Sequence, residues 1–416
     1  MMNISYFMSL SAALESLHII KLLPDFEAAG RIAKYPSPKL QLEFLGTGVV
    51  SKRDLSECDL PLKNGSYAST VKDVQQLCNN VFQVTLDISG LEWQYSPGDA
   101  IAVHCKNSDD TVSAVFGKLD LPEAVGINSP CRVTSQSPLP LHFHGIMTPN
   151  IILKQLNLLS FPKKAFLKYL ADCCSNPLDE AYLNFLSSAA GAEAYTRLVG
   201  FQHNIVDVLC TFSSCRPTLT RLMEHLPCLA PRYYSITNSP KNGLEHIDIV
   251  FDCIKYSLNG YAFAGLCSSQ LKNLTPGNLV EVSPKIRTKM SFSLDESEDP
   301  ILMICTGTGL APFISFLQHM HSNLRKKVLI YGHRRSELDS DQIFGAQLAE
   351  FVNQGLELIE CLSQENSKYS YVYEALADPE VICGLESASI YVCGSLKMLQ
   401  SIKKLLWKEY QYEGWN

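Results

Sequence analysis

The segment 301–313 restricts the fold of this chain more than any other part of the sequence. Five apolar residues are followed by Gly307-Thr308-Gly309, which permits a tight turn, and then by Pro312, which suits the first turn of a helix. A buried strand that turns directly into a helix is the building block of a parallel sheet. The same alternation recurs further along, with strands expected at 328–331, 356–362 and 389–393. Residues 298–416 are therefore predicted to form a doubly wound α/β domain.

An earlier part of the chain has the pattern of antiparallel strands. Residues 82–88 alternate between apolar and polar side chains, the period-two pattern of a half-buried strand. Pro97-Gly98-Asp99 marks a turn, and a second apolar strand is expected directly after it. Strand patterns return at 232–238 and 246–253. We assign these strands to an antiparallel β-barrel made of residues 67–108 and 229–297.

The residues between the two parts of the barrel have a helical pattern. Apolar side chains recur at three- and four-residue spacing in the segments 149–159, 162–174, 178–190 and 194–212. Pro162 lies where one helix would begin, and Pro177 where another has ended. Residues 109–228 are therefore predicted to be a helical domain inserted into the barrel. Residues 1–66 are predicted to be a linker or N-terminal extension, with an amphipathic helix at 1–23.

Composition excludes several classes of function. The formal net charge is −7, which disfavours nucleic-acid binding because that requires a basic surface. Fifteen cysteines without a C-x-x-C pair fit reduced thiols in a cytoplasmic protein better than a disulfide framework. No apolar segment has the length and uniformity of a membrane span. We therefore expect a cytoplasmic protein with neither a nucleic-acid nor a membrane partner.

The residues Arg232-Tyr233-Tyr234-Ser235 have the chemistry that a flavin dinucleotide requires. An arginine can bind phosphate oxygens with two hydrogen bonds, a tyrosine can stack on the ring system, and a serine hydroxyl can hydrogen bond to N5. A second phosphate contact is expected at Gly265-Leu266-Cys267-Ser268, where a helix begins. The alternatives are a core strand with an aromatic pair and an ordinary Gly/Ser loop.

Two further motifs belong to the predicted parallel sheet. The turn at Gly307-Thr308-Gly309 has the strand–turn–helix context in which backbone N–H groups bind a pyrophosphate. Tyr391-Val392-Cys393-Gly394 ends the last strand, and strand ends line the ligand crevice of such sheets. Cys393 is therefore a candidate for contact with a nicotinamide ring. The alternatives are a structural turn and a buried core thiol.

Taken in order, the barrel strands, the helical insert and the motifs R-x-Y-S, G-T-G-x-A-P-F and Y-V-C-G resemble a known family. This family is the diflavin reductases of the ferredoxin-NADP reductase superfamily, and the similarity is to their FAD/NADPH half. The insert corresponds to the connecting domain of that family. Further similarity, for example at 161–167, 214–217 and 224–227, is to its methionine synthase reductase branch.

The resemblance implies that FAD and NADPH are the cofactors. For FAD it implies Arg232, Tyr233, Tyr234 and Ser235, with Gly265, Cys267 and Ser268 at the pyrophosphate. For the NADPH pyrophosphate it implies Gly307, Thr308, Gly309 and Pro312. Ser235 and Cys393 would be the catalytic residues beside the path of hydride transfer. No residue is expected to bind a metal.

The second NADPH motif of the family, S-R-x(n)-K-x-Y-V-Q, is altered in this chain. Ser363 and Tyr371 are retained, but Gln364 stands where the family has the arginine that binds the 2′-phosphate. Arg334 and Arg335 follow a strand and could bind that phosphate instead. Another departure is Ser395, where an aspartate is usual after Y-V-C-G.

The expected function is that of an NADPH-dependent FAD reductase of the methionine synthase reductase type. Only residues 1–66 precede the barrel, whereas a flavodoxin-like FMN domain has the size of an ordinary domain. We therefore expect FMN to lie on a partner or on a missing domain, with methionine synthase as the acceptor beyond it. The alternatives are another diflavin-class reductase, of the cytochrome or sulfite reductase type, and a non-catalytic flavoprotein.

Overall fold

The computed structural model describes most of the chain in two compact units. The described residues are 38–45, 65–78, 80–91, 93–135, 143, 145–201, 203–243, 245–258, 261–285, 299–320, 325–334 and 343–410. One unit contains the insert, with Cys105–Ala230 and Tyr256–Leu266, and also the strand β1 (Leu40–Phe44). The other contains the barrel strands and the C-terminal sheet. The predicted N-terminal helix at 1–23 lies outside the described residues.

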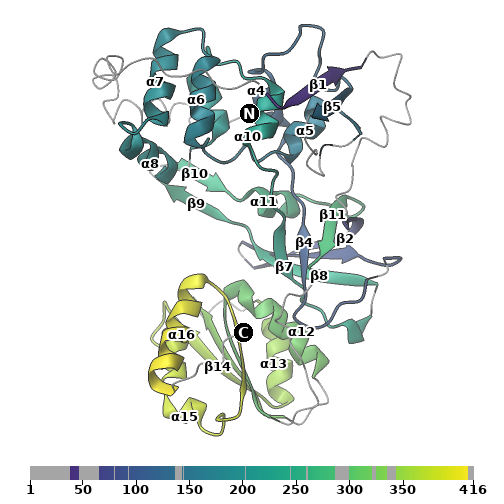
Figure 1. Cartoon of the computed structure of the whole chain (residues 1–416). Coiled ribbons are helices and arrows are strands. Elements are labelled where there is room, and N and C mark those ends of the chain that lie inside the picture. The colour runs from purple at the N-terminus through teal and green to yellow at the C-terminus, as the bar shows by residue number, and fades with distance from the viewer. Residues whose placement is uncertain are drawn as a thin grey trace. The chain divides into compact units, whose positions relative to one another are not determined.

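Six antiparallel strands form the predicted barrel (Figure 1). In spatial order they are β7 (Arg232–Ser235), β4 (Ala100–Val103), β11 (Leu279–Pro284), β2 (Tyr67–Cys78), β3 (Val81–Asp87) and β8 (His246–Asp252). A bridge between Ile236 and Ile249 joins the two edge strands and closes the barrel. In β3 the residues Phe82, Val84 and Leu86 are buried and their neighbours are half-buried, as the period-two pattern predicted. A separate two-stranded ladder pairs β9 (Lys255–Leu258) with β10 (Tyr261–Ala264).

The insert is mainly helical, as predicted. Its helices are α4 (Asp109–Phe116), α5 (Pro149–Gln155), α6 (Lys164–Asp172), α7 (Pro177–Ser187), α8 (Ala192–Gly200), α9 (Ile205–Thr211) and α10 (Leu219–His225). It also contains a three-stranded sheet of β1, β5 (Cys131–Ser135) and β6 (Ile146–Met147), which the helical prediction missed. In β5 the side chains alternate between buried and exposed, and the buried Cys131 and Val133 belong to the core of the insert. This alternation is what stabilises the segment as a strand.

The single helix predicted at 194–212 was wrong, because the chain forms two helices there. α8 ends at Gly200, and Asn204 begins α9 by accepting hydrogen bonds from the backbone N–H groups of Val206 and Asp207. The side chain of Asp207 accepts in turn from the N–H of Asn204, which completes a capping box. The apolar spacing continued across the break and concealed it.

The C-terminal region is a four-stranded parallel sheet, as predicted (Figure 1). Its strands are β12 (Ile301–Thr306), β13 (Lys327–His333), β14 (Leu356–Leu362) and β15 (Ser389–Cys393). One face packs on α12 (Ala311–His319) and α13 (Gly345–Asn353), and the other on α14 (Val372–Leu376), α15 (Pro379–Ile382) and α16 (Leu396–Tyr410). Ile301–Cys305 are fully buried, because both faces of a doubly wound sheet are covered. Among the described residues, no helix is long and apolar enough to cross a membrane.

Candidate functional site

The glycine-rich turn follows β12 directly and leads into α12. Gly307–Leu310 form a short 3₁₀ turn, and Gly307 has a φ of +53°, which favours glycine. Pro312 lies in the first turn of α12, where a missing N–H costs no helical hydrogen bond. The sequence therefore predicted this turn correctly, with Pro312 in the first turn of the helix.

The turn lies at the point where the strand order of the sheet reverses. The chain runs from β12 outward to β13 and β14, and then returns to place β15 on the other side of β12. β12 and β15 are parallel, with Cys305 opposite Cys393. Their carboxyl ends therefore meet at a topological switch point, which is where open α/β sheets bind ligands. This arrangement brings the predicted Gly307–Gly309 and Cys393 together.

Gly309 lies against the backbone at the end of β15. A Cβ atom at this position would be 2.4 Å from the carbonyl oxygen of Cys393 and 3.3 Å from Cα of Gly394. No side chain fits there, so the turn and the strand end can pack closely and leave backbone N–H groups near the crevice. A dinucleotide pyrophosphate requires this close approach of backbone, and the residues of the turn fit such a group.

Cys393 is half-buried at the end of β15. Burial raises the pKa of its thiol, so the sulfur keeps its proton at neutral pH. Burial also raises the pKa of Cys305, its neighbour on β12, well above the usual range. The end of β15 therefore carries a neutral thiol rather than a thiolate.

The predicted flavin motif is the strand β7, which pairs with β4. Arg232 and Tyr233 are exposed, whereas Tyr234 and Ser235 are half-buried. Nζ of Lys285 lies 4.8 Å from the centroid of the Tyr233 ring, which is a cation–π contact. Tyr234 packs edge-on against Phe251 of β8, with 5.9 Å between the ring centroids. The strand therefore carries an exposed cation next to an exposed aromatic ring, and the flavin roles of these residues stay predictions.

The segment that follows β7 is hydrogen bonded to the helix that follows the glycine-rich turn. The hydroxyl of Ser315 donates to the carbonyl of Asn238 at 3.0 Å. Oε1 of Gln318 accepts from the backbone N–H of Ser239 at 2.8 Å and from the side chain of Asn242 at 3.0 Å. Sequence reasoning assigned no role to these residues, because nothing in their spacing indicates that they meet.

The other predicted phosphate residues lie around α11 (Leu266–Lys272), which begins after Gly265. Cys267 and Ser268 are both buried in the first turn of this helix. Oγ of Ser268 accepts a hydrogen bond from the backbone N–H of Ile254 at 3.3 Å. The Ser268 hydroxyl thus joins α11 to the end of β8, and the phosphate roles of these residues stay predictions.

Of the second NADPH motif, Ser363 and Gln364 follow β14, and Tyr371 lies at the start of α14. The N–H of Ser363 donates to the carbonyl of His333 at 3.1 Å, and the N–H of Gln364 to that of Arg334 at 3.0 Å. Arg334 is exposed, and Tyr371 is 52% exposed and stacked on Tyr373. Arg335 lies outside the described residues. Arg334 thus follows β13, the strand next to β12, whereas the aromatic pair lies at the start of α14.

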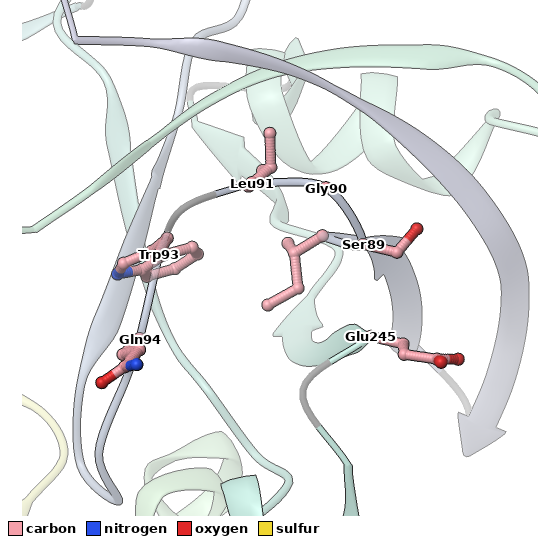
Figure 2. A pocket seen from close by; sticks show the side chains of 7 residues that line it. Ser89, Gly90, Leu91, Trp93, Gln94 and Glu245 are labelled. Carbon is pink, nitrogen blue, oxygen red and sulfur yellow. The ribbon is translucent and has the colours of Figure 1, made fainter.

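A separate hollow of about 810 Å³ lies on the barrel. Its lining residues are Ile88, Ser89, Gly90, Leu91, Trp93, Gln94 and Glu245. Figure 2 shows Trp93 and Gln94 on one side of it and Ser89 and Glu245 on the other. None of these residues was predicted for the site, and none belongs to the motifs above. Among the described residues, no cluster of His, Cys, Asp and Glu side chains could hold a metal ion.

Two family models match the chain. The FAD binding domain matches residues 62–270, and the oxidoreductase NAD-binding domain matches residues 303–404. The first match covers half of the chain and includes the helices of the insert and five of the six barrel strands, without β11. The second covers the sheet that carries the glycine-rich turn.

Curated relatives match most of the chain. NADPH oxidoreductase A of Dictyostelium discoideum is 31% identical over 75% of this chain and 50% of its own length. Human methionine synthase reductase is 31% identical over 78% of this chain and 54% of its own length. NADPH–cytochrome P450 reductase of Drosophila melanogaster is 30% identical over 80% of this chain and 51% of its own length. The chain thus spans about half the length of these relatives. It belongs to the FAD binding domain family and carries an oxidoreductase NAD-binding domain, with FAD and NADPH as the cofactors of these two domains.

Proposed function

We propose that this chain is the FAD/NADPH half of a diflavin reductase of the methionine synthase reductase type. It would pass electrons from NADPH through FAD towards an FMN-containing domain and then towards methionine synthase. The observation that carries the proposal is the close packing at the switch point, where Gly309 lies against the end of β15 beside Cys393. The similarity to human methionine synthase reductase over 78% of the chain supports the choice of branch.

The residues of the flavin motif would bind and orient FAD. The guanidinium of Arg232 would bind the pyrophosphate, and Tyr234, on the same face of the strand, would supply an aromatic surface for the ring. The hydroxyl of Ser235 would hydrogen bond near N5. Bound FAD supplies the redox chemistry, accepting two electrons from a reduced nicotinamide and releasing them one at a time.

The residues of the crevice would place NADPH. Backbone N–H groups of Gly307–Gly309 would bind its pyrophosphate at the start of α12. Cys393 would lie beside the nicotinamide with the proton on its own Sγ atom, because burial raises the pKa of the thiol. The contribution of this chain is thus positioning and exclusion of water.

An anaerobic titration of the purified protein tests this function. We expect a yellow protein with bound FAD whose absorbance in the visible region is bleached by NADPH. Failure to bleach in an FAD-loaded protein would favour the non-catalytic alternative.

A second assay tests the acceptor. The similarity to a cytochrome P450 reductase at 30% identity supports another diflavin-class reductase as the second candidate. Electron delivery to the FMN domain of human methionine synthase reductase is expected to exceed delivery to the FMN domain of a cytochrome P450 reductase. The reverse order would overturn the assignment to the methionine synthase reductase type.

Arg334→Ala is expected to weaken the binding of NADPH far more than the binding of NADH. In sheets of this kind an arginine near the ribose accommodates the 2′-phosphate of NADPH, and Arg334 is exposed at the end of β13, next to the switch strand. Loss of a charged hydrogen bond costs about 1.5 to 3 kcal/mol, or roughly a 10- to 150-fold rise in Kd. Binding of the two nucleotides is measured by titration with their non-reducing oxidised forms.

The matched control for this prediction is Arg197→Ala, at an exposed arginine of α8 in the other unit. It is expected to change neither affinity. If Arg334→Ala weakened the binding of both nucleotides equally, a contact between Arg334 and the 2′-phosphate would be contradicted.

A further inference from the structure

Two cysteines of the insert lie directly opposite each other although 40 residues separate them in the sequence. Cys174 follows the end of α6, and Cys215 follows α9. They form an isolated antiparallel bridge. The hydrogen bonds of this bridge come from the flanking residues, with Arg216 N–H donating to Cys173 O at 3.0 Å and Ser175 N–H to Ser214 O at 3.4 Å.

This pattern makes Cys174 and Cys215 a non-hydrogen-bonded pair. Opposite residues of this kind have Cα atoms roughly 4.5 Å apart, with their side chains close together. Disulfides require a Cα separation of about 4.4 to 6.8 Å. The backbone therefore already has the spacing that a bridge between these two residues needs.

The two thiol groups also share one hydrogen-bond acceptor. Each donates a hydrogen bond to the carbonyl oxygen of Leu170, at 3.3 Å in both cases. The pKa of Cys215 is raised far above its usual value, first by its hydrogen bond with the Cys174 thiol and then by burial. Cys215 has no exposed surface, whereas Cys174 is half-buried. A reagent in solution therefore reaches Cys174 first.

We propose that Cys174 and Cys215 are a redox modification site that forms a reversible disulfide when a peroxide is the oxidant. The Cys174 sulfur attacks one oxygen of hydrogen peroxide, the O–O bond breaks, and the other oxygen takes up the thiol proton and leaves as water. The Cys215 sulfur then attacks the resulting sulfenic acid, the S–O bond breaks, and the S–S bond forms. Two thiols lose two electrons and two protons, and the peroxide is reduced to two waters. Exchange with glutathione restores both thiols.

The neighbouring Cys173 has a different partner, although it is adjacent in the sequence. It shares a hydrogen bond with the hydroxyl of Tyr169, and burial raises the pKa of Cys173 to about 11. The antiparallel pairing places Cys174, rather than Cys173, opposite Cys215. Cys173 is thus the matched control for the reactive pair.

The disulfide would close a loop that contains α7, α8 and α9. These helices contribute Leu183, Leu198 and Leu209 to the core of the insert. A cross-link over a loop of this length restricts the unfolded chain, so oxidation is expected to stabilise the insert.

Peptide mapping of the full chain with bound FAD tests the proposal. The protein is reduced, freed of reductant, treated with hydrogen peroxide and digested without reduction. We expect one cross-linked peptide that joins Cys174 to Cys215, lacks two hydrogen atoms, and is lost after incubation with reduced glutathione. Cys383 is exposed, so its oxidation shows that the peroxide reacted.

The variants and a thermal measurement sharpen this test. Cys173→Ser is expected to keep the cross-link and Cys174→Ser to lose it. Oxidation is expected to raise the Tm of the wild type by roughly 5 to 10 °C and to leave that of Cys174→Ser unchanged. A cross-link between Cys173 and Cys174, or oxidation of Cys383 with no cross-link at all, would overturn the proposal. The mapping of the wild type needs no variant to fold.

Discussion

Replacing Gly309 by alanine is expected to lower the rate of FAD reduction by NADPH at least about 100-fold, because small misplacements of a reacting group cost that much. The new Cβ atom would be 2.4 Å from O and 2.9 Å from C of Cys393, and both are backbone atoms that cannot rotate away. The turn or the end of β15 must therefore shift, and both belong to the proposed NADPH crevice. Anaerobic stopped-flow absorbance measures the rate.

Gly200→Ala is the matched control for this prediction. Gly200 is the last residue of α8, and a Cβ atom there would meet no atom within 4 Å. Its effect on the rate should be negligible, and alanine in a helix is at least as favourable as glycine. FAD content must stay at the wild-type level in Gly309→Ala, so that a slow rate reports NADPH placement rather than loss of the flavin. A wild-type rate in Gly309→Ala would remove the crevice from the proposed mechanism.

Arg232→Ala is expected to weaken FAD binding roughly 10- to 150-fold, since a hydrogen bond to a charged group contributes about 1.5 to 3 kcal/mol. Arg232 is exposed on β7, beside Tyr233 and one residue before Tyr234. Its planar guanidinium can bind two phosphate oxygens at once, which a lysine cannot do in the same geometry. The ratio of FAD to protein after purification and a fluorescence titration of the apoprotein measure the effect.

Two further variants serve as controls for this result. Arg132→Ala removes an exposed arginine from β5 in the other unit, where its Nη1 atom lies 3.9 Å from Oε2 of Glu43. This variant should leave the FAD content unchanged. Arg232→Lys keeps the charge but not the planar geometry, so it should recover only part of the affinity. Unchanged flavin content in Arg232→Ala would show that this arginine does not bind the cofactor.

The parallel sheet could be predicted because its determinants are local in the sequence. In β12 a run of five buried apolar residues leads into two glycines and then Pro312, so strand, turn and helix start are all encoded within one short segment. The motif in β7 was visible for the same reason. Its arginine, tyrosines and serine are consecutive, and strand geometry alone places them.

The insert shows where such reasoning fails. Apolar spacing predicted one helix at 194–212, although Asn204 and Asp207 were a readable capping box that begins a new helix. β1 lies in the segment assigned to a linker or N-terminal extension, and its pairing with β5 joins residues about 90 positions apart along the chain. When a strand pairs with residues far away along the chain, its own sequence contains too little information to identify the strand with which it pairs.

The amino-acid sequence was sufficient for the fold class and for the cofactor class, because each depends on patterns among neighbouring residues. Three features became visible only once the chain was folded. Gly309 packs against Cys393, Gln318 holds Ser239, and Cys174 faces Cys215. Each joins residues 41 or more positions apart, and their proximity depends on strand order and on the packing of whole elements. No periodicity or motif along the chain encodes such contacts, so the structure was needed to locate the crevice and the thiol pair.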